Sequence, residues 1–288
     1  MILIILTRVL LSVSGNAVQK RLLLDGMRVT PLWLITYTLM LLPGLAFAAL
    51  RPAPMGSGFW LNILAGGLLD AIGNLAMVAA LETTHLSIFG PLNAFRPALA
   101  LFFGWLFLAE KPTLPGFAGV SVMVLGAWAL FGNVRVNEKK PPGGVVWRTI
   151  MLRVTGLSMS TAGAVFLKRA AMVSSPQAAL AGWIVCGLAC VLIVSILRDR
   201  GPGKLIKSGL AKHSGWLVLH AFAFFVMQWI TIYIFKRTLL AYSFVYFQLG
   251  MVLQVFIGAL IFKEPAFKRR LAACGIMSLG AALIAWKG

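Results

Sequence analysis

The stretch "FLAEKPTLPGFAGVSVMVLGAWAL" (107–130) recurs without a gap as "IFKEPAFKRRLAACGIMSLGAALI" (261–284), which lies 154 residues further along the chain. This shift pairs Gly126 with Gly280 in the middle of an apolar run. A run of this length can cross a hydrocarbon core about 30 Å thick as a helix. The chain therefore contains one membrane-type helix in two copies, and this duplication decides the fold that we expect.

A second match indicates a repeat that is longer than one helix. The segments "GNAVQKR" (15–21) and "GAVFLKR" (163–169) align at a shift of 148 residues. Since both ends of a module recur, we expect a first five-helix repeat at 1–133, a linker loop at 134–146 and a second five-helix repeat at 147–288. A duplication without functional consequence is the alternative.

The composition of the whole chain is typical of a membrane protein. It has 288 residues, of which 60% are hydrophobic and 11% charged, and its mean hydropathy is +0.92. Soluble domains carry about 25% charged residues. Backbone groups in lipid must be hydrogen-bonded within their own segment, so the apolar runs should be helices. The predicted helices are 1–22, 31–50, 59–81, 86–109, 114–133, 147–169, 177–197, 214–235, 239–262 and 267–286.

We therefore predict an all-α integral membrane protein with ten transmembrane helices, arranged as two inverted five-helix repeats. The second repeat is inverted because each repeat has an odd number of spans. Inverted repeats are typical of secondary transporters, which bind substrate near the membrane midplane between the two halves. The architecture therefore favours transport.

Several other classes of protein are disfavoured. The longest polar stretches, 133–148 and 198–213, are the size of loops and leave no room for a soluble domain. Cys186, Cys190 and Cys274 lie inside predicted helices and have no disulfide or zinc spacing. The net charge of +19 comes mostly from loops and does not indicate nucleic acid. We expect no cofactor, no metal site and no catalytic residue, because the histidines and acids are not clustered as a membrane enzyme needs.

The predicted helix 86–109 leads into the most informative motif of the chain. Its second part reads "RPALALFFGWLFLAE" (96–110), with Pro97 thirteen residues before Glu110, and the small-residue helix "GFAGVSVMVLGA" (116–127) follows. In these features the chain resembles the EamA-type members of the drug/metabolite transporter superfamily. The resemblance covers essentially the whole chain and implies ten helices with both termini in the cytoplasm. It also implies transport of small metabolites, amino acids, sugars or drugs, and in some relatives of lipid-linked groups.

Charged residues inside the predicted helices are few. Of the 26 lysines and arginines, 23 fall in loops or at helix ends by these boundaries, and Arg8, Arg96 and Arg153 do not. Arg153 is close enough to its helix start to reach the interface. Arg96 is deep in its helix, where a charge costs about 2.5–3.5 kcal/mol. Asp70 is the acid at the middle of a helix, and Asn74 follows one turn later on the same face.

Two interpretations explain a buried Arg96. It can form an internal salt bridge with Asp70, or it can anchor the carboxylate or phosphate of a substrate, since arginine offers a planar fork of donors. Both interpretations hold if a substrate anion displaces Asp70 from Arg96. We predict that Arg96 anchors substrate in a central cavity with Asp70 as its resting partner, and that Pro97 lets the helix bend.

The repeat extends the predicted site to the second half. At the 154-residue shift Arg96 aligns with Gly250, which belongs to a stripe with Tyr242, Tyr246 and Gln254. The first repeat then has a charged side chain, Arg96, at the position where the second repeat has a glycine without a side chain. For the tyrosines, and for a histidine in the eighth helix, ordinary packing is the alternative. The predicted substrate-binding residues are Arg96, Asp70, Asn74, Asn93, Arg8, His220, Gln228, Tyr242, Tyr246 and Gln254.

The balance of deep charges predicts the kind of substrate. Arg8 and Arg96 outnumber Asp70, which favours a negatively charged substrate over a simple cation. We therefore predict a secondary transporter or exporter that moves a small organic anion or zwitterionic metabolite by alternating access. A flippase for a lipid-linked phosphate or sugar is the alternative. The expected setting is the bacterial inner membrane, as a multi-pass monomer or dimer in contact with the lipid bilayer and with no nucleic acid.

The loop charges and the resemblance predict opposite orientations. The odd-numbered loops carry 16 lysines and arginines, and the opposite side, including the termini, carries 7. The positive-inside rule then places the odd loops in the cytoplasm and both termini outside. We follow the charge count, because every loop is short.

Overall fold

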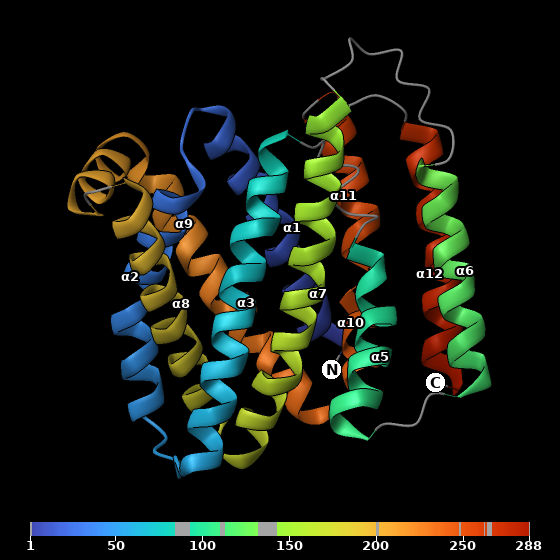
Figure 1. Cartoon of the computed structure of the whole chain (residues 1–288), viewed down its shortest axis with the longest axis horizontal. Helices are drawn as coiled ribbons and strands as arrows, with labels where there is room; N and C mark the ends of the chain where they lie inside the picture. The colour runs from blue at the N-terminus through green and yellow to red at the C-terminus, as the bar shows by residue number, and fades with distance from the viewer. Residues whose placement is uncertain are drawn as a thin grey trace.

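The computed structural model confirms the all-α class (Figure 1). All regular structure in the part of the chain that it describes is helical, and no strand occurs there. The described residues are 2–83, 93–109, 113–131, 143–199, 202–247, 249–261, 263 and 267–287.

The helices follow the apolar runs of the sequence. In the first half they are α1 (Ile2–Leu24), α2 (Val29–Ala49), α3 (Ser57–Thr83), the 3-10 turn η1 (Asn93–Phe95), α5 (Arg96–Leu108) and α6 (Leu114–Phe131). In the second half they are α7 (Gly143–Val173), α8 (Pro176–Asp199), α9 (Pro202–Arg237), α10 (Leu240–Phe247), α11 (Leu249–Leu260) and α12 (Phe267–Lys287).

Length and composition identify membrane-crossing helices among these elements. Six segments of the described chain are long and apolar enough to cross a membrane. They are Ile2–Leu24, Val29–Ala49, Ser57–Ala80, Pro176–Leu197, His213–Arg237 and Leu240–Leu260. Large apolar side chains on the outside of the bundle, such as Leu42, Leu197 and Leu260, are 77% exposed, which suits contact with lipid. The chain is a multi-pass helical membrane protein, and the count of ten spans stays a prediction.

The helix expected over 86–109 differs around Arg96. Asn93–Phe95 forms η1, and α5 begins at Arg96, so this arginine is the first residue of a helix and does not lie in its middle. Pro97 explains the start, because it has no N–H to donate and its fixed φ suits the first helical turn. The part of the expected helix before Asn93 lies outside the described residues.

One other predicted boundary is revised. The segment 198–213, expected as a loop, is helical from Pro202 and joins the rest of α9 across a kink at His213. Leucine, lysine and alanine in this segment are good helix formers, and their propensity outweighs its polarity. The helix expected at 239–262 corresponds to the span Leu240–Leu260, whose described parts are α10 and α11. Most of the predicted linker loop, 134–146, lies outside the described residues.

Glycines let α3 and α7, which lie side by side in Figure 1, pack backbone against backbone. A Cβ atom on Gly73 would lie 2.8 Å from the carbonyl oxygen of Gly156, and one on Gly163 would lie 2.9 Å from the carbonyl oxygen of Gly66. Real Cβ atoms essentially never approach so closely. Only glycine therefore fits this crossing, which sets how near the polar residues of α3 and α7 come to one another.

Candidate functional site

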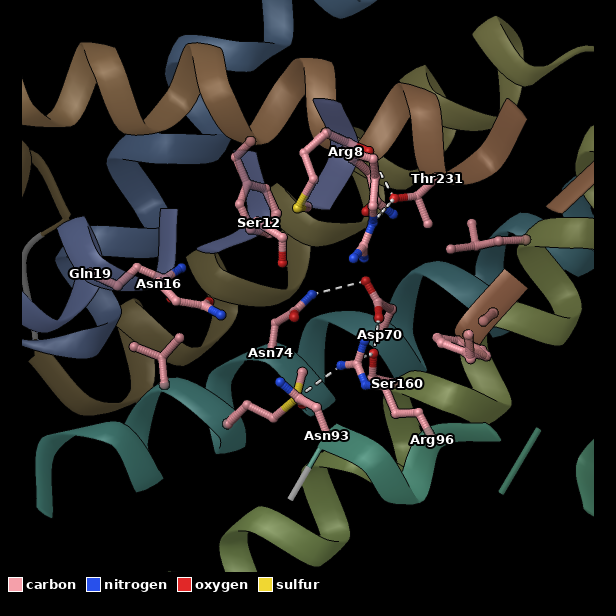
Figure 2. Close-up of a pocket in the computed structure, with 18 of the residues that line it drawn as sticks. Arg8, Ser12, Asn16, Gln19, Asp70, Asn74, Asn93, Arg96, Ser160 and Thr231 are labelled. Carbon is pink, nitrogen blue, oxygen red and sulfur yellow. Dashed lines mark hydrogen bonds between the residues drawn. The ribbon is translucent and has the colours of Figure 1, made fainter. Parts of the chain in front are cut away.

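A polar cavity of about 90 Å³ lies inside the bundle, between α1, α2, α3, η1, α5, α7, α9 and α10. In Figure 2, Arg8 reaches in from one side and Asn93 and Arg96 from the other, with Asp70 between them. A polar space of this volume can hold several water molecules. Six of the predicted residues line it: Arg8, Asp70, Asn74, Asn93, Arg96 and Gln228.

Asp70 on α3 accepts three hydrogen bonds. Its Oδ1 accepts from the Ser160 hydroxyl at 2.5 Å, and its Oδ2 accepts from the Asn74 amide at 2.9 Å and the Trp183 indole N–H at 2.7 Å. All three partners donate, which suits an ionised carboxylate, because that group has acceptors only. The network ties α3 to α7 and α8 at the wall of the cavity.

Arg96 has weak acceptors within the described chain. Its Nη2 donates to Met77 Sδ at 3.2 Å and to Ser160 Oγ at 3.4 Å, and its Nε is buried without a hydrogen-bond partner. The direct salt bridge expected with Asp70 is wrong, because the Ser160 hydroxyl lies between the two groups (Figure 2). The serine donates to the carboxylate and accepts from the guanidinium. The cation is therefore near an acid without being paired to it.

Two more arginines are buried close by. The Nε of Arg8 on α1 donates to Thr231 Oγ1 on α9 at 3.1 Å. Arg153, expected to reach the interface, is 1% exposed, and its Nη2 donates to Asn93 Oδ1 at 2.5 Å. That expectation is wrong because the turn before α5 offers an acceptor inside the bundle. Arg8 and Arg153, which are buried, and Arg96, which is half-buried, thus lie close to the one buried carboxylate among the described residues, that of Asp70.

A second cavity of about 40 Å³ adjoins the first and is bounded by α11. Arg8 and Arg96 line both cavities. Gly250, which aligns with Arg96 in the repeat, lines the second one together with Gln254, which is 3% exposed. Arg96 and Gly250 therefore face the same small cavity. The ring of Phe247 also lines this cavity and lies 3.6 Å from the guanidinium carbon of Arg8.

His220, Tyr242 and Tyr246 line neither cavity. His220 is fully buried behind the aromatic wall of the first cavity, where its Nδ1 lies 3.2 Å from Thr36 Oγ1. Tyr242 is half-buried, and Tyr246 is 37% exposed. The structure thus leaves these three side chains away from the space where the other seven converge. Among the described residues, no cluster of His, Cys, Asp or Glu could hold a metal ion.

Ser160 is the central residue that sequence reasoning missed, together with Trp183 and Thr231. Serine and threonine inside membrane helices usually bond their own backbone, so their presence carries little signal. A signal lay in the spacing of Gly156 and Gly163, which flank Ser160 on α7 and mark a close helix crossing. That signal becomes specific only when the partner helix is known.

The fold and the site define a class, which is a polytopic helical membrane protein with buried charges around an internal cavity. Ionisable residues in such positions mark substrate or ion pathways. Residues 1–132 match the sequence profile of the EamA-like transporter family. The match covers just under half of the chain, and it confirms the predicted resemblance to this family, which is part of the drug/metabolite transporter superfamily.

Comparison with solved structures supports the fold. One crystal structure of a protein matches with a TM-score of 0.64 at 18% sequence identity, covering 98% of this chain and 94% of its own. At this sequence identity the similarity supports a shared fold and says nothing about function. No curated protein matches the chain.

Proposed function

We propose that this protein is a secondary-active transporter or exporter of a small organic anion or zwitterionic metabolite. It works by alternating access, with the substrate held between the two halves of the chain. The match of residues 1–132 to the EamA-like transporter family supports transport over catalysis. The negative charge of the proposed substrate is inferred from the contacts of Arg96.

The observation that carries the proposal is that the half-buried Arg96 has no anionic partner among the described residues. Strong hydrogen bonds between arginine and a carboxylate measure about 2.7–2.9 Å. Arg96 has a thioether sulfur at 3.2 Å and a serine oxygen at 3.4 Å instead. A carboxylate or phosphate that entered the cavity would supply the missing acceptors. Arg8 lines the same space and adds a second positive charge.

We also propose that the two halves are inverted repeats with the boundaries predicted above. Helix packing supports this: α3 packs on α7 as its counterpart α9 packs on α1, and α2 packs on α9 as α8 packs on α3. At the α6–α12 contact a Cβ on Gly126 would meet Met277, and a Cβ on Gly280 would meet Met123. Such reciprocal contacts are expected when two equivalent units pack about a two-fold axis.

For its cellular setting, we propose the bacterial inner membrane, where the protein is a monomer or dimer surrounded by lipid. The bias of 16 basic residues against 7 supports placing the odd-numbered loops in the cytoplasm. A fluorescent reporter that matures only in the cytoplasm, fused to the C-terminus, tests this orientation. A dark fusion is expected, and a bright one would support the opposite topology.

A flippase for a lipid-linked phosphate or sugar is the second candidate. The strong basic loading of one set of loops favours it, because such loops attract anionic head groups. A lipid phosphate would need a lateral path for its acyl chain, whereas a soluble metabolite would not. Binding of a lysophosphatidic acid in preference to short carboxylates would favour the flippase.

Thermal unfolding of the purified protein separates these candidates. Propionate, alanine, tetramethylammonium and lysophosphatidic acid serve as the anion, zwitterion, cation and lipid phosphate. We expect propionate or alanine to raise the melting temperature and tetramethylammonium to have no effect. Stabilisation by the cation with no effect of the anions would overturn the proposal.

A further inference from the structure

We propose that Gln254 recognises a neutral hydrogen-bond donor on the substrate, so that the preferred substrate is a small hydroxy-carboxylate. This inference rests on the proposed function and narrows its substrate class. It assigns one part of the substrate to each cavity. The carboxylate lies between Arg8 and Arg96, and the hydroxyl group lies in the second cavity.

Gln254 has an unmet hydrogen bond where a ligand could supply it. The side chain is 3% exposed, lines the second cavity, and its Oε1 is buried without a partner in the described chain. A buried acceptor without a donor is unfavourable, because it has lost its water and gained nothing in return. A donor that occupied the cavity would satisfy it.

The two arginines determine which part of a ligand reaches Gln254. Arg8 and Arg96 both line the first and the second cavity, so they lie where the two spaces meet. Arg96 also presents a buried Nε without a partner. A carboxylate held by these guanidinium groups would place the substituent on its neighbouring carbon in one of the two cavities. The second has room for a group the size of a hydroxyl or a water molecule.

Charge selects a neutral donor over an ammonium group. None of the described residues that line the second cavity is acidic, whereas two of them are arginines. An ammonium group would be repelled there, since like charges interact strongly in a poorly solvated space. In the first cavity Asp70 already accepts three hydrogen bonds from the protein, which occupy most of the roughly four sites of a carboxylate. The site therefore suits a hydroxyl-bearing anion better than an amino acid.

Four short carboxylates test this assignment by calorimetric titration of the purified full chain. Lactate carries a hydroxyl donor, propionate lacks it, 2-methoxypropionate has an acceptor without a donor, and alanine has an ammonium group. We expect lactate to bind about tenfold more tightly than propionate, as one well-made hydrogen bond allows. The methoxy compound and alanine should bind no better than propionate.

Gln254→Leu removes the acceptor while keeping a similar volume, and Gln254→Met serves if the leucine variant does not fold. In either variant the affinity for lactate should fall to the affinity for propionate. An unchanged affinity for propionate shows that the site is intact. A preference for lactate that persists in the variant overturns the inference, as does equal binding of lactate and propionate by the natural chain. Tighter binding of alanine or 2-methoxypropionate than of lactate also overturns it.

The same titrations distinguish the inference from the function on which it rests. Suppose that the natural chain binds lactate and propionate equally and that Arg96→Ala abolishes binding of both. The inference about Gln254 then fails, and the proposed anion transporter stands. If none of the four carboxylates binds the natural chain, the proposed function fails and the inference fails with it.

Discussion

The contact between α3 and α7 and the contact between α1 and α9 are counterparts in the proposed repeat, yet they are built differently. At α3–α7 a Cβ on Gly73 would lie 2.7 Å from the backbone nitrogen of Ser160, so the two backbones touch. On α1, a Cβ on Gly15, which aligns with Gly163 of α7, would have no neighbour within 4 Å, and Arg8 bridges to Thr231 on α9 through its side chain. The first contact can separate only by losing close packing, whereas the second can adjust by side-chain rotation.

This difference separates two kinds of residue at one site. Asp70 lies on the close-packed contact, where its position is set by three hydrogen bonds. Arg8 lies on the other contact, where one side-chain hydrogen bond to Thr231 joins α1 to α9. We therefore expect substitutions at α3–α7 to reduce stability strongly and substitutions at α1–α9 to reduce it little.

Asp70→Ala should have the largest effect on the close-packed contact. It leaves the Ser160 hydroxyl, the Asn74 amide and the Trp183 indole without their shared acceptor inside the bundle. We expect the free energy of unfolding in detergent to fall by about 3–5 kcal/mol, as when one member of a buried charged network is removed.

The matched control is Asp25→Ala, because Asp25 pairs with Arg21 at the protein surface. An exposed pair of this kind contributes at most about 1 kcal/mol. Equal losses in the two variants would show that the Asp70 network does not hold α3 and α7 together.

Gly73→Ala and Gly15→Ala compare the two contacts at the level of the backbone. The first places a methyl group 2.7 Å from the Ser160 nitrogen, and the second places one in open space. We expect Gly73→Ala to cost about 1–3 kcal/mol through overpacking. Gly15→Ala should be neutral or stabilise by up to about 1 kcal/mol, because alanine favours helix. Similar midpoints in thermal unfolding of the two variants would contradict the contrast.

Ser160→Ala and Thr231→Val compare the hydroxyl groups that hold the two arginines. Ser160 donates to the Asp70 carboxylate, and a hydrogen bond to a charged group contributes about 1.5–3 kcal/mol. Thr231 accepts one bond from Arg8 at 3.1 Å, for which we expect a loss of about 1 kcal/mol. Chemical denaturation measures both, and a larger loss for Thr231→Val would reverse the assignment of the rigid contact.

The sequence predicted the residues whose chemistry is unusual in a membrane. Arg8, Arg96 and Asp70 are conspicuous in the sequence because a charge inside an apolar membrane helix is energetically costly and therefore rare. All three line the central cavity. The all-α class and the resemblance to the EamA-like family followed from hydropathy and from the motif around Pro97. These features depend on local composition and spacing, which a single sequence contains.

The residues that were missed depend on tertiary packing. Ser160 matters only because glycines bring α7 against α3, and a serine by itself has no such signal. Arg153 was expected at the interface because its length allows it, but Asn93 from another element holds it inside. The start of α5 at Arg96 also escaped prediction, since the hydrophobic run continues across it.

The central claim is that Arg96 binds an anion, and titration of lactate into three forms of the chain tests it most directly. The forms are the natural chain, Arg96→Ala, and Arg51→Ala as a control at an exposed arginine. Loss of a buried, charged hydrogen-bonding partner costs about 2–5 kcal/mol in binding, so affinity should fall at least about thirtyfold in Arg96→Ala. It should be unchanged in Arg51→Ala. An affinity in Arg96→Ala equal to that of the natural chain would contradict the account.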